Sequence, residues 1–135
     1  MNQLKGTITE IRSVEGLSLV KVKTANETVF SSLVLGDTGS TEWLIEGKPV
    51  KLHFREIEVM ISTDAQLNIS IQNRLPCTVH SLNTGEILSQ VNLMFGETPV
   101  TAIITANACM QLNLKVNDKV VALIKTNEIS ISPDD

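Results

Sequence analysis

The chain of 135 residues contains an internal repeat, which limits the folds it can adopt. The segment NQLKGTI near the start resembles NRLPCTV in the middle, so that Asn2 and Leu4 align with Asn73 and Leu75. The offset is 71 residues at Asn73 (73 minus 2) and 70 at Ser132 (132 minus 62), so a single deletion explains the drift. A unit of this length is too long for a stacked solenoid repeat and suits one complete small β-barrel.

Each half carries five short segments that are alternating or rich in Val and Ile, separated by Gly, Asn and Asp. They predict strands at residues 5–11, 17–23, 28–34, 50–54 and 59–62, and again at 77–82, 87–94, 100–105, 120–125 and 129–132. One short helix is expected between the third and fourth strand of each half, at 36–45 and at 105–114, where Thr105 or Asn107 can cap it.

The pattern therefore predicts an all-β fold of two tandem five-stranded barrels of the OB type, each with one short helix and each formed by its own repeat. The expected boundaries are residues 1–62 for a first, diverged repeat, 63–68 for a linker and 69–135 for a second repeat.

Composition excludes several classes of function. Cys77 and Cys109, without a basic start followed by an apolar stretch, indicate reduced thiols and a cytoplasmic location. No apolar run approaches the roughly 20 residues that a membrane-spanning helix needs, so no membrane insertion is expected. A net charge of −4 without a basic cluster, and 3% aromatic residues without Tyr, argue against direct nucleic-acid binding.

The sequence also offers no catalytic or metal-binding pattern. The two histidines, His53 and His80, lie within expected strands without a nucleophile at a suggestive spacing. Cys77 and His80 are three residues apart on one strand and so face opposite sides, which argues against a zinc site. Neither a carboxylate pair nor a glycine-rich phosphate loop is recognisable, so we expect no enzyme.

Small polar residues do gather where expected strands begin and end: Ser70, Gln72 and Asn73 at one, and Lys125, Thr126 and Asn127 at another. Such residues are most often ordinary solvated surface. A barrel of this size is filled by its own side chains, so any ligand would have to bind on loops or between barrels.

At these residues the second repeat resembles the Mop or TOBE family of molybdate-binding domains. Its segments SIQNRL (70–75), TAIITANACMQLNL (101–114) and ALIKTNEISI (122–131) are similar to the family's opening Ser-Ala-Arg-Asn-x-Leu, its middle strand and helix, and its closing Ala-Leu-Ile-Lys-Ala-Ser. The resemblance implies an oxyanion site formed by Ser70, Ile71 through its backbone, Gln72, Asn73, Thr105, Lys125 and Thr126. Molybdate offers only acceptors, so hydroxyl and amide donors with one cation suit it.

The chain departs from the family pattern at several positions. Gln72 stands where the family has Arg, and Lys125 is followed by Thr-Asn rather than Ala-Ser. In the first repeat the Ser-Ala-Arg portion is absent before Asn2, Val34 stands opposite Thr105, and Glu56 would repel an anion. Asn2 and Arg55 are therefore candidates for a diverged site, in a half that is either structural or completes a site made mainly by another chain.

The resemblance implies a protein that binds molybdate or tungstate at interfaces between barrels, for molybdenum storage, homeostasis or sensing, within a homo-oligomer, a trimer or a dimer. The alternative is a non-catalytic interaction module, either the detached sensor half of a molybdate-responsive regulator or a partner of a molybdate transporter's ATPase subunit. An OB-type oligonucleotide binder conflicts with the acidic charge and the scarce aromatic residues.

Overall fold

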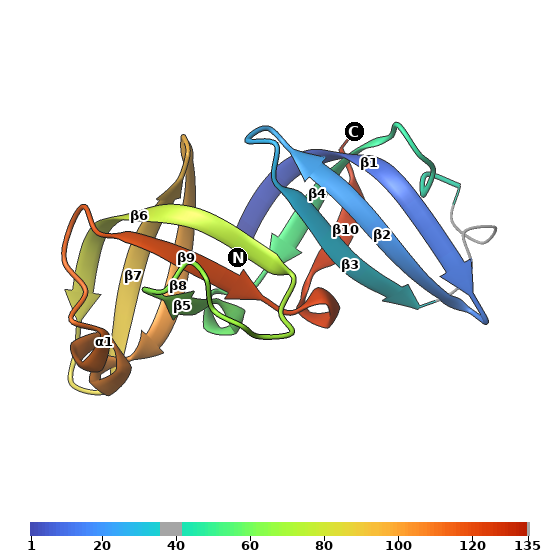
Figure 1. Cartoon of the computed structure of the whole chain (residues 1–135). Coiled ribbons are helices and arrows are strands. Elements are labelled where there is room, and N and C mark those ends of the chain that lie inside the picture. The colour runs from blue at the N-terminus through green and yellow to red at the C-terminus, as the bar shows by residue number, and fades with distance from the viewer. Residues whose placement is uncertain (36–41, 135) are drawn as a thin grey trace.

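The computed structural model describes residues 1–35 and 42–134, which form two five-stranded antiparallel sheets lying side by side (Figure 1). Their strand orders are β10-β4-β1-β2-β3 and β5-β9-β6-β7-β8. The expectation of an all-β fold with two OB-like units is confirmed. No helix in these two stretches is long and apolar enough to cross a membrane.

All ten expected strands are present, with ends shifted by up to a few residues. In the first repeat they are β1 (Asn2–Val14), β2 (Leu17–Thr24), β3 (Val29–Leu35), β4 (Pro49–Phe54) and, after the 3₁₀ helix η2 (Glu56–Glu58), β5 (Met60–Ser62). In the second they are β6 (Asn73–Thr84), β7 (Leu88–Phe95), β8 (Thr98–Thr105), β9 (Lys119–Ile124) and, after η3 (Thr126–Glu128), β10 (Ser130–Pro133).

The helix expected in the second repeat is α1 (Ala106–Leu112). Thr105 caps it, because its Oγ1 accepts a hydrogen bond of 3.0 Å from the N–H of Ala108. The helix ends at Leu112 and is followed by Asn113, whose left-handed conformation (φ 52°) suits a short polar residue. Of the helix expected at 36–45, residues 36–41 lie outside the described residues, and 42–45 form turns and a bend.

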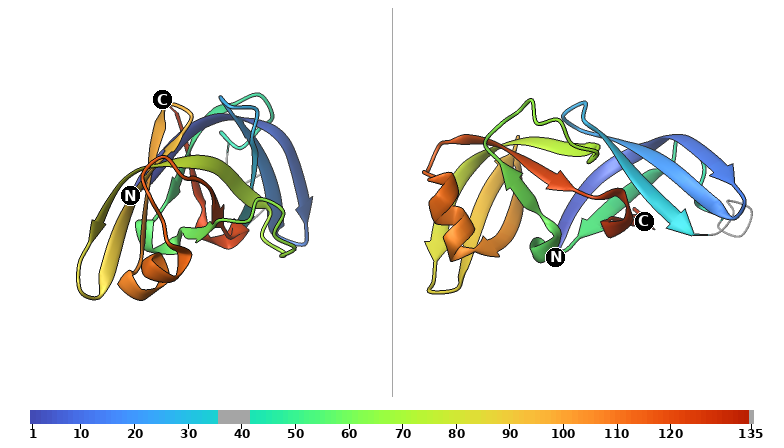
Figure 2. Two further views of the ribbon diagram at one scale, coloured as in Figure 1. Left: turned by 60° about the vertical axis from the view of Figure 1, so that its left-hand side comes forward. Right: turned by 60° about the horizontal axis from the view of Figure 1, so that its bottom comes forward.

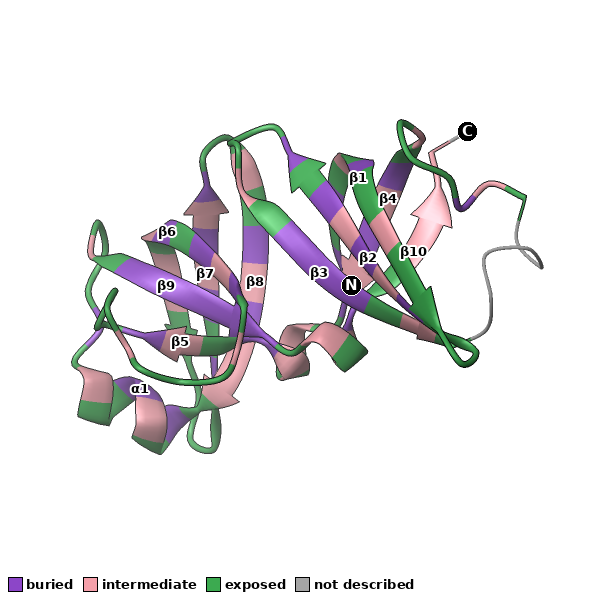
Figure 3. Cartoon of the chain, turned by 45° about the vertical axis from the view of Figure 1, so that its right-hand side comes forward, coloured by how far each residue is buried: buried purple, intermediate pink, exposed green. Residues whose placement is uncertain are grey.

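Each barrel is filled by the inward side of its strands, which explains the alternation in the sequence. Buried and exposed bands follow one another along most strands (Figure 3). Leu75, Cys77 and Val79 on β6 are each at most 5% exposed, and the intervening Pro76 and Thr78 are more exposed. In the first barrel, the stacked rings of Phe30 and Phe54 lie 6.5 Å apart between centroids.

The last strand of each repeat belongs to the sheet of the other repeat. β5 pairs with β9, and β10 pairs with β4, where Ser130 lies opposite His53. Val59 and Ile129, at the ends of η2 and η3, are buried to 1% and 4% exposure. The expectation that each repeat closes its own barrel is therefore wrong. The repeats share one strand pattern, so either terminal strand fits either sheet, and the chain crosses between the sheets after β4 and β9 (Figure 2).

Candidate functional site

Two buried asparagines join the sheets. Asn73, at the start of β6, accepts from the N–H of Ser31 on β3 (2.7 Å) and donates to its carbonyl (2.9 Å). Asn2, at the start of β1, makes the same two bonds to Thr101 on β8, at 2.8 and 2.7 Å. β3 and β8 are edge strands, so each side-chain amide satisfies backbone groups that no neighbouring strand covers. These contacts define two seams, the Lys125 seam (Asn73, Ser31, Lys125) and the Arg55 seam (Asn2, Thr101, Arg55).

The Lys125 seam brings most of the predicted oxyanion residues together. Asn73 pairs with Ile124, so the segment just before β6, with Ser70, Ile71 and Gln72, lies at the same end of this strand pair as Lys125 and Thr126 just after β9. Ser70, Gln72 and Lys125 are exposed. Within residues 1–35 and 42–134, Lys125 forms no ion pair, so its charge is not neutralised there.

β3 of the first repeat supports this seam at a second point. The Ser32 hydroxyl, which is fully buried, donates to the carbonyl of Ile129 at 2.8 Å. Ile129 directly follows η3, which begins at Thr126. Adjacent residues of one edge strand therefore hold both chain segments of the candidate site, one through Asn73 and the other through Ile129.

The Arg55 seam has the same framework but internally paired charges. Arg55 forms an ion pair with Glu58 (2.6 Å), and Glu56 pairs with the amino group of Met1 (2.8 Å). The hydrogen bond from this amino group lowers the pKa of Glu56, and a backbone N–H adds to the effect. Asn2 and Arg55, the candidates for a diverged site, thus lie at one seam, together with carboxylates that disfavour an anion.

Thr105 is separated from the other predicted residues within one chain. It ends β8, and its hydroxyl oxygen caps α1. It lines a largely apolar groove of about 600 Å³ together with Ile57 of η2 and Leu88 of β7, and so belongs beside the Arg55 seam. The first-repeat residue in its place is Val34, on β3 at the Lys125 seam.

Arg74 is a residue that the sequence interpretation missed. Its guanidinium donates three hydrogen bonds to backbone carbonyls of the preceding segment, from Nη1 to Leu67 (2.6 Å), from Nη2 to Ile69 (2.8 Å) and from Nε to Ile71 (3.0 Å). The position gives no signal in sequence, because it falls on the unspecified residue between Asn and Leu in the family motif.

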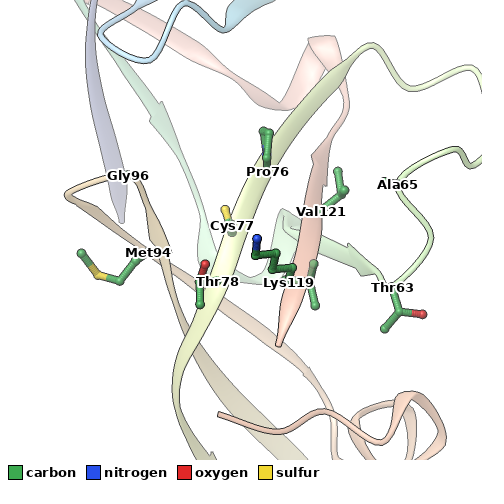
Figure 4. A pocket seen from close by; sticks show the side chains of 10 residues that line it. Thr63, Ala65, Pro76, Cys77, Thr78, Met94, Gly96, Lys119 and Val121 are labelled. Atoms are coloured by element: carbon green, nitrogen blue, oxygen red, sulfur yellow. The ribbon is translucent and has the colours of Figure 1, made fainter. Parts of the chain in front are cut away.

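A separate hollow of about 440 Å³ lies against β6 and β9 and contains none of the predicted oxyanion residues (Figure 4). Lys119 is the only charged side chain that lines it, next to Cys77 and Thr78, and Met94 lines the hollow farther from Lys119. Burial raises the pKa of the Cys77 thiol to about 12, so this cysteine stays protonated and unreactive near neutral pH. The described part of the chain contains no cluster of three or more His, Cys, Asp or Glu residues suited to a metal ion.

The two sheets, their short helices and their crossing terminal strands define a tandem OB-like β-barrel protein. A crystal structure of the cytoplasmic molybdate-binding protein ModG, with molybdate bound, shares this fold across nearly all of both chains. It covers 98% of this chain and 95% of its own, with a TM-score of 0.91 and 24% identity. A molybdate-binding protein from Sporomusa ovata covers 44% of this chain and 88% of its own, with 32% identity and a TM-score of 0.43.

Residues 69–131 match the TOBE domain model, which confirms the resemblance inferred from the motifs of the second repeat. A curated relative, the molybdenum transport protein ModE of Azotobacter vinelandii, is 24% identical over 133 residues. The match covers 97% of this chain and 49% of the relative, so the chain spans about half the length of that protein.

Proposed function

We propose that the chain is a cytoplasmic, non-catalytic binder of molybdate or tungstate, with the anion held at the Lys125 seam. The observation that carries the proposal is the unpaired Lys125 beside the exposed segment of Ser70 and Gln72. The ligands would be the hydroxyls of Ser70 and Thr126, the Gln72 amide, backbone N–H groups around Ile71, and the Lys125 ammonium. The similarity to the molybdate-binding protein ModG and to the molybdenum transport protein ModE supports molybdate as the anion.

The physical chemistry of the seam suits a fully deprotonated oxyanion. Charge-assisted hydrogen bonds from an ammonium to an oxyanion are about twice as strong as neutral ones. Hydrogen phosphate carries a proton that needs an acceptor, so a site whose hydroxyls, amides and ammonium all donate to the anion favours the fully deprotonated form. Thr105 would then be contributed by a second chain, because within one chain it lies beside the Arg55 seam.

The first repeat has a supporting role in this proposal. Arg55 and Glu56 occupy the positions of Lys125 and Thr126, and both are already paired. Binding would therefore saturate at one seam per chain, with the Arg55 seam remaining without ligand. Replacing Glu56 by Thr, its counterpart in the second repeat, removes one of the repelling carboxylates there.

Isothermal titration with molybdate tests the proposal. We expect saturable binding, weakened about 10- to 100-fold in Lys125→Ala, because a hydrogen bond to a charged group contributes roughly 1.5–3 kcal/mol. The matched control is Lys119→Ala, which removes an exposed lysine from the same strand pair at the separate hollow and should bind as the unmodified chain does. Absence of heat above dilution, or a loss in Lys119→Ala rather than Lys125→Ala, would contradict the proposed site.

A second candidate function is an interaction module of a molybdate-responsive regulator or transporter. It is favoured by the match to about half of the molybdenum transport protein ModE. In this case the chain would recruit a specific protein only with the anion bound, whereas a storage protein would bind the anion without a partner. A pull-down with and without molybdate distinguishes the two.

A further inference from the structure

The backbone segment 67–71, which precedes β6, is held by hydrogen bonds to the side chain of Arg74. The Arg74 guanidinium donates three hydrogen bonds, one each to the backbone carbonyls of Leu67, Ile69 and Ile71. These carbonyls alternate along the chain, so every second peptide group in the segment turns its oxygen toward the same guanidinium. The rigid fork of arginine, with five donors, matches such an array, which the single ammonium of lysine does not.

This arrangement sets the direction of the N–H groups in the candidate site. In a trans peptide, the N–H of one residue points away from the carbonyl of the residue before it, and the described chain has no cis peptide. Because the carbonyls of Ile69 and Ile71 face Arg74, the N–H groups of Ser70 and Gln72 point away from the guanidinium. Neither N–H donates in the turn and loop hydrogen bonds of the described residues.

The charge of Arg74 is used differently from that of Lys125. Arg74 has no ion pair with a described carboxylate, and three of its five N–H donors are bonded to carbonyls of its own chain. In the first repeat its counterpart is Gln3, which cannot donate three such bonds. The ordered segment is therefore a property of the second repeat, where the unpaired lysine also lies.

We propose that Arg74 is a positioning residue that orients the Ser70 and Gln72 N–H groups toward a bound oxyanion by fixing the carbonyls of Leu67, Ile69 and Ile71. This inference rests on the proposed function of the Lys125 seam. Arg74 does not touch the anion, and its effect is carried by the backbone of residues 67–72. Two backbone donors held in advance lower the ordering cost of binding a small dianion.

The test compares Arg74→Gln and Arg74→Lys by isothermal titration with molybdate and by ¹⁵N-¹H spectra of the full chain. We expect both variants to bind at least about tenfold more weakly, because the lysine keeps the charge but loses the fork. In the unmodified chain, molybdate should shift the Ser70 and Gln72 amide protons downfield, and both variants should lose these shifts. Arg12→Gln, an exposed arginine on β1 with the same change in charge, is the control and should bind normally.

The outcomes separate this inference from the proposed function. If the unmodified chain binds molybdate and Arg74→Lys binds equally well, Arg74 acts only through its charge and the inference is wrong. It is equally wrong if the Ser70 and Gln72 amides of the unmodified chain do not move on binding, a result that needs no variant to fold. If the unmodified chain shows no binding at all, the proposed function fails first, and unchanged amide positions of residues 67–71 in ligand-free Arg74→Gln would overturn the positioning role as well.

Discussion

Asn73 and Asn2 each act as a substitute for a missing strand. A neighbouring strand would offer a carbonyl and an N–H to the exposed edge of β3 or β8, and a side-chain amide offers the same two groups in one plane. Asn73 is fully buried and Asn2 is 6% exposed, so water cannot replace these bonds. Each asparagine therefore attaches one barrel to the other while protecting an edge strand.

Replacing Asn73 by Asp should strongly destabilise the ligand-free protein. The carboxylate keeps an acceptor for the Ser31 N–H but places a buried negative charge against the Ser31 carbonyl. We expect a loss of roughly 2–5 kcal/mol in the free energy of unfolding at pH 7, measured by urea denaturation. Burial raises the pKa of such a carboxyl, and its protonated form can donate, so part of the loss should be recovered as the pH falls toward 4.

Asn2→Asp is the matched control for this change, since it alters the same pair of bonds at the Arg55 seam. It should also destabilise the protein. A loss below about 1 kcal/mol in Asn73→Asp would show that the amide contacts with Ser31 are not needed to join the barrels.

The terminal strands β5 and β10 make the two barrels interdependent. Each supplies an edge to the sheet of the other repeat, and the residue before it is buried, Val59 before β5 and Ile129 before β10. On β4, the imidazole Nε2 of His53 lies 2.7 Å from the hydroxyl of Ser132 on β10, a contact that also joins the two repeats. Unfolding of one barrel therefore removes a strand from the other.

Ile129→Ala tests this exchange. Removal of a buried isoleucine side chain costs about 2–5 kcal/mol. Because β10 pairs with β4, amide hydrogen exchange should become faster in the sheet that contains β1 to β4 before it does elsewhere, although Ile129 belongs to the second repeat. Val59→Ala is the corresponding change in the first repeat. It should speed hydrogen exchange in β9, because Val59 precedes β5 and β5 pairs with β9. Faster exchange confined to the repeat that carries the substitution would contradict the observed pairing.

In the whole molecule, the surface beside the Arg55 seam is more apolar than the surface beside the Lys125 seam. The groove beside the Arg55 seam is lined by apolar side chains that remain substantially exposed, including Ile57 (61%), Leu88 (53%) and Met60 (41%). At the Lys125 seam the counterpart of Ile57 is the polar Asn127. Apolar surface of this kind favours association, and Thr105 lies within the groove.

We expect the purified chain to be a homo-oligomer, a trimer or a dimer, when its mass is measured by light scattering. Ile57→Asp should shift it toward the monomer mass of 14.7 kDa, because the charge would have to be buried in the contact. Val14→Asp, at a similarly exposed apolar position (57%) in the first barrel, is the control and should leave the mass unchanged. A monomer in the unmodified chain, with or without molybdate, would contradict a site shared between chains.

Much of the secondary structure could be predicted, because alternation of apolar and polar residues reports which side of a strand faces a core. That pattern located all ten strands, the candidate capping residues Thr105 and Asn107 located α1, and the spacing of Asn2 and Asn73 revealed the repeat. The motif residues of the candidate site could be named from the second repeat, since Ser70, Gln72 and Lys125 lie on segments that adjacent strand pairing brings together.

The amino-acid sequence thus determined the elements, their order and the positions of the donors, all of which depend on local pattern. Tertiary structure alone decided that β5 and β10 exchange sheets, that Thr105 and Lys125 lie at different seams, and that Asn73 contacts Ser31. Alternation shows that a side is buried but not which partner buries it. Two similar repeats offer two nearly equivalent partners, and only the path of the chain between the sheets selects one.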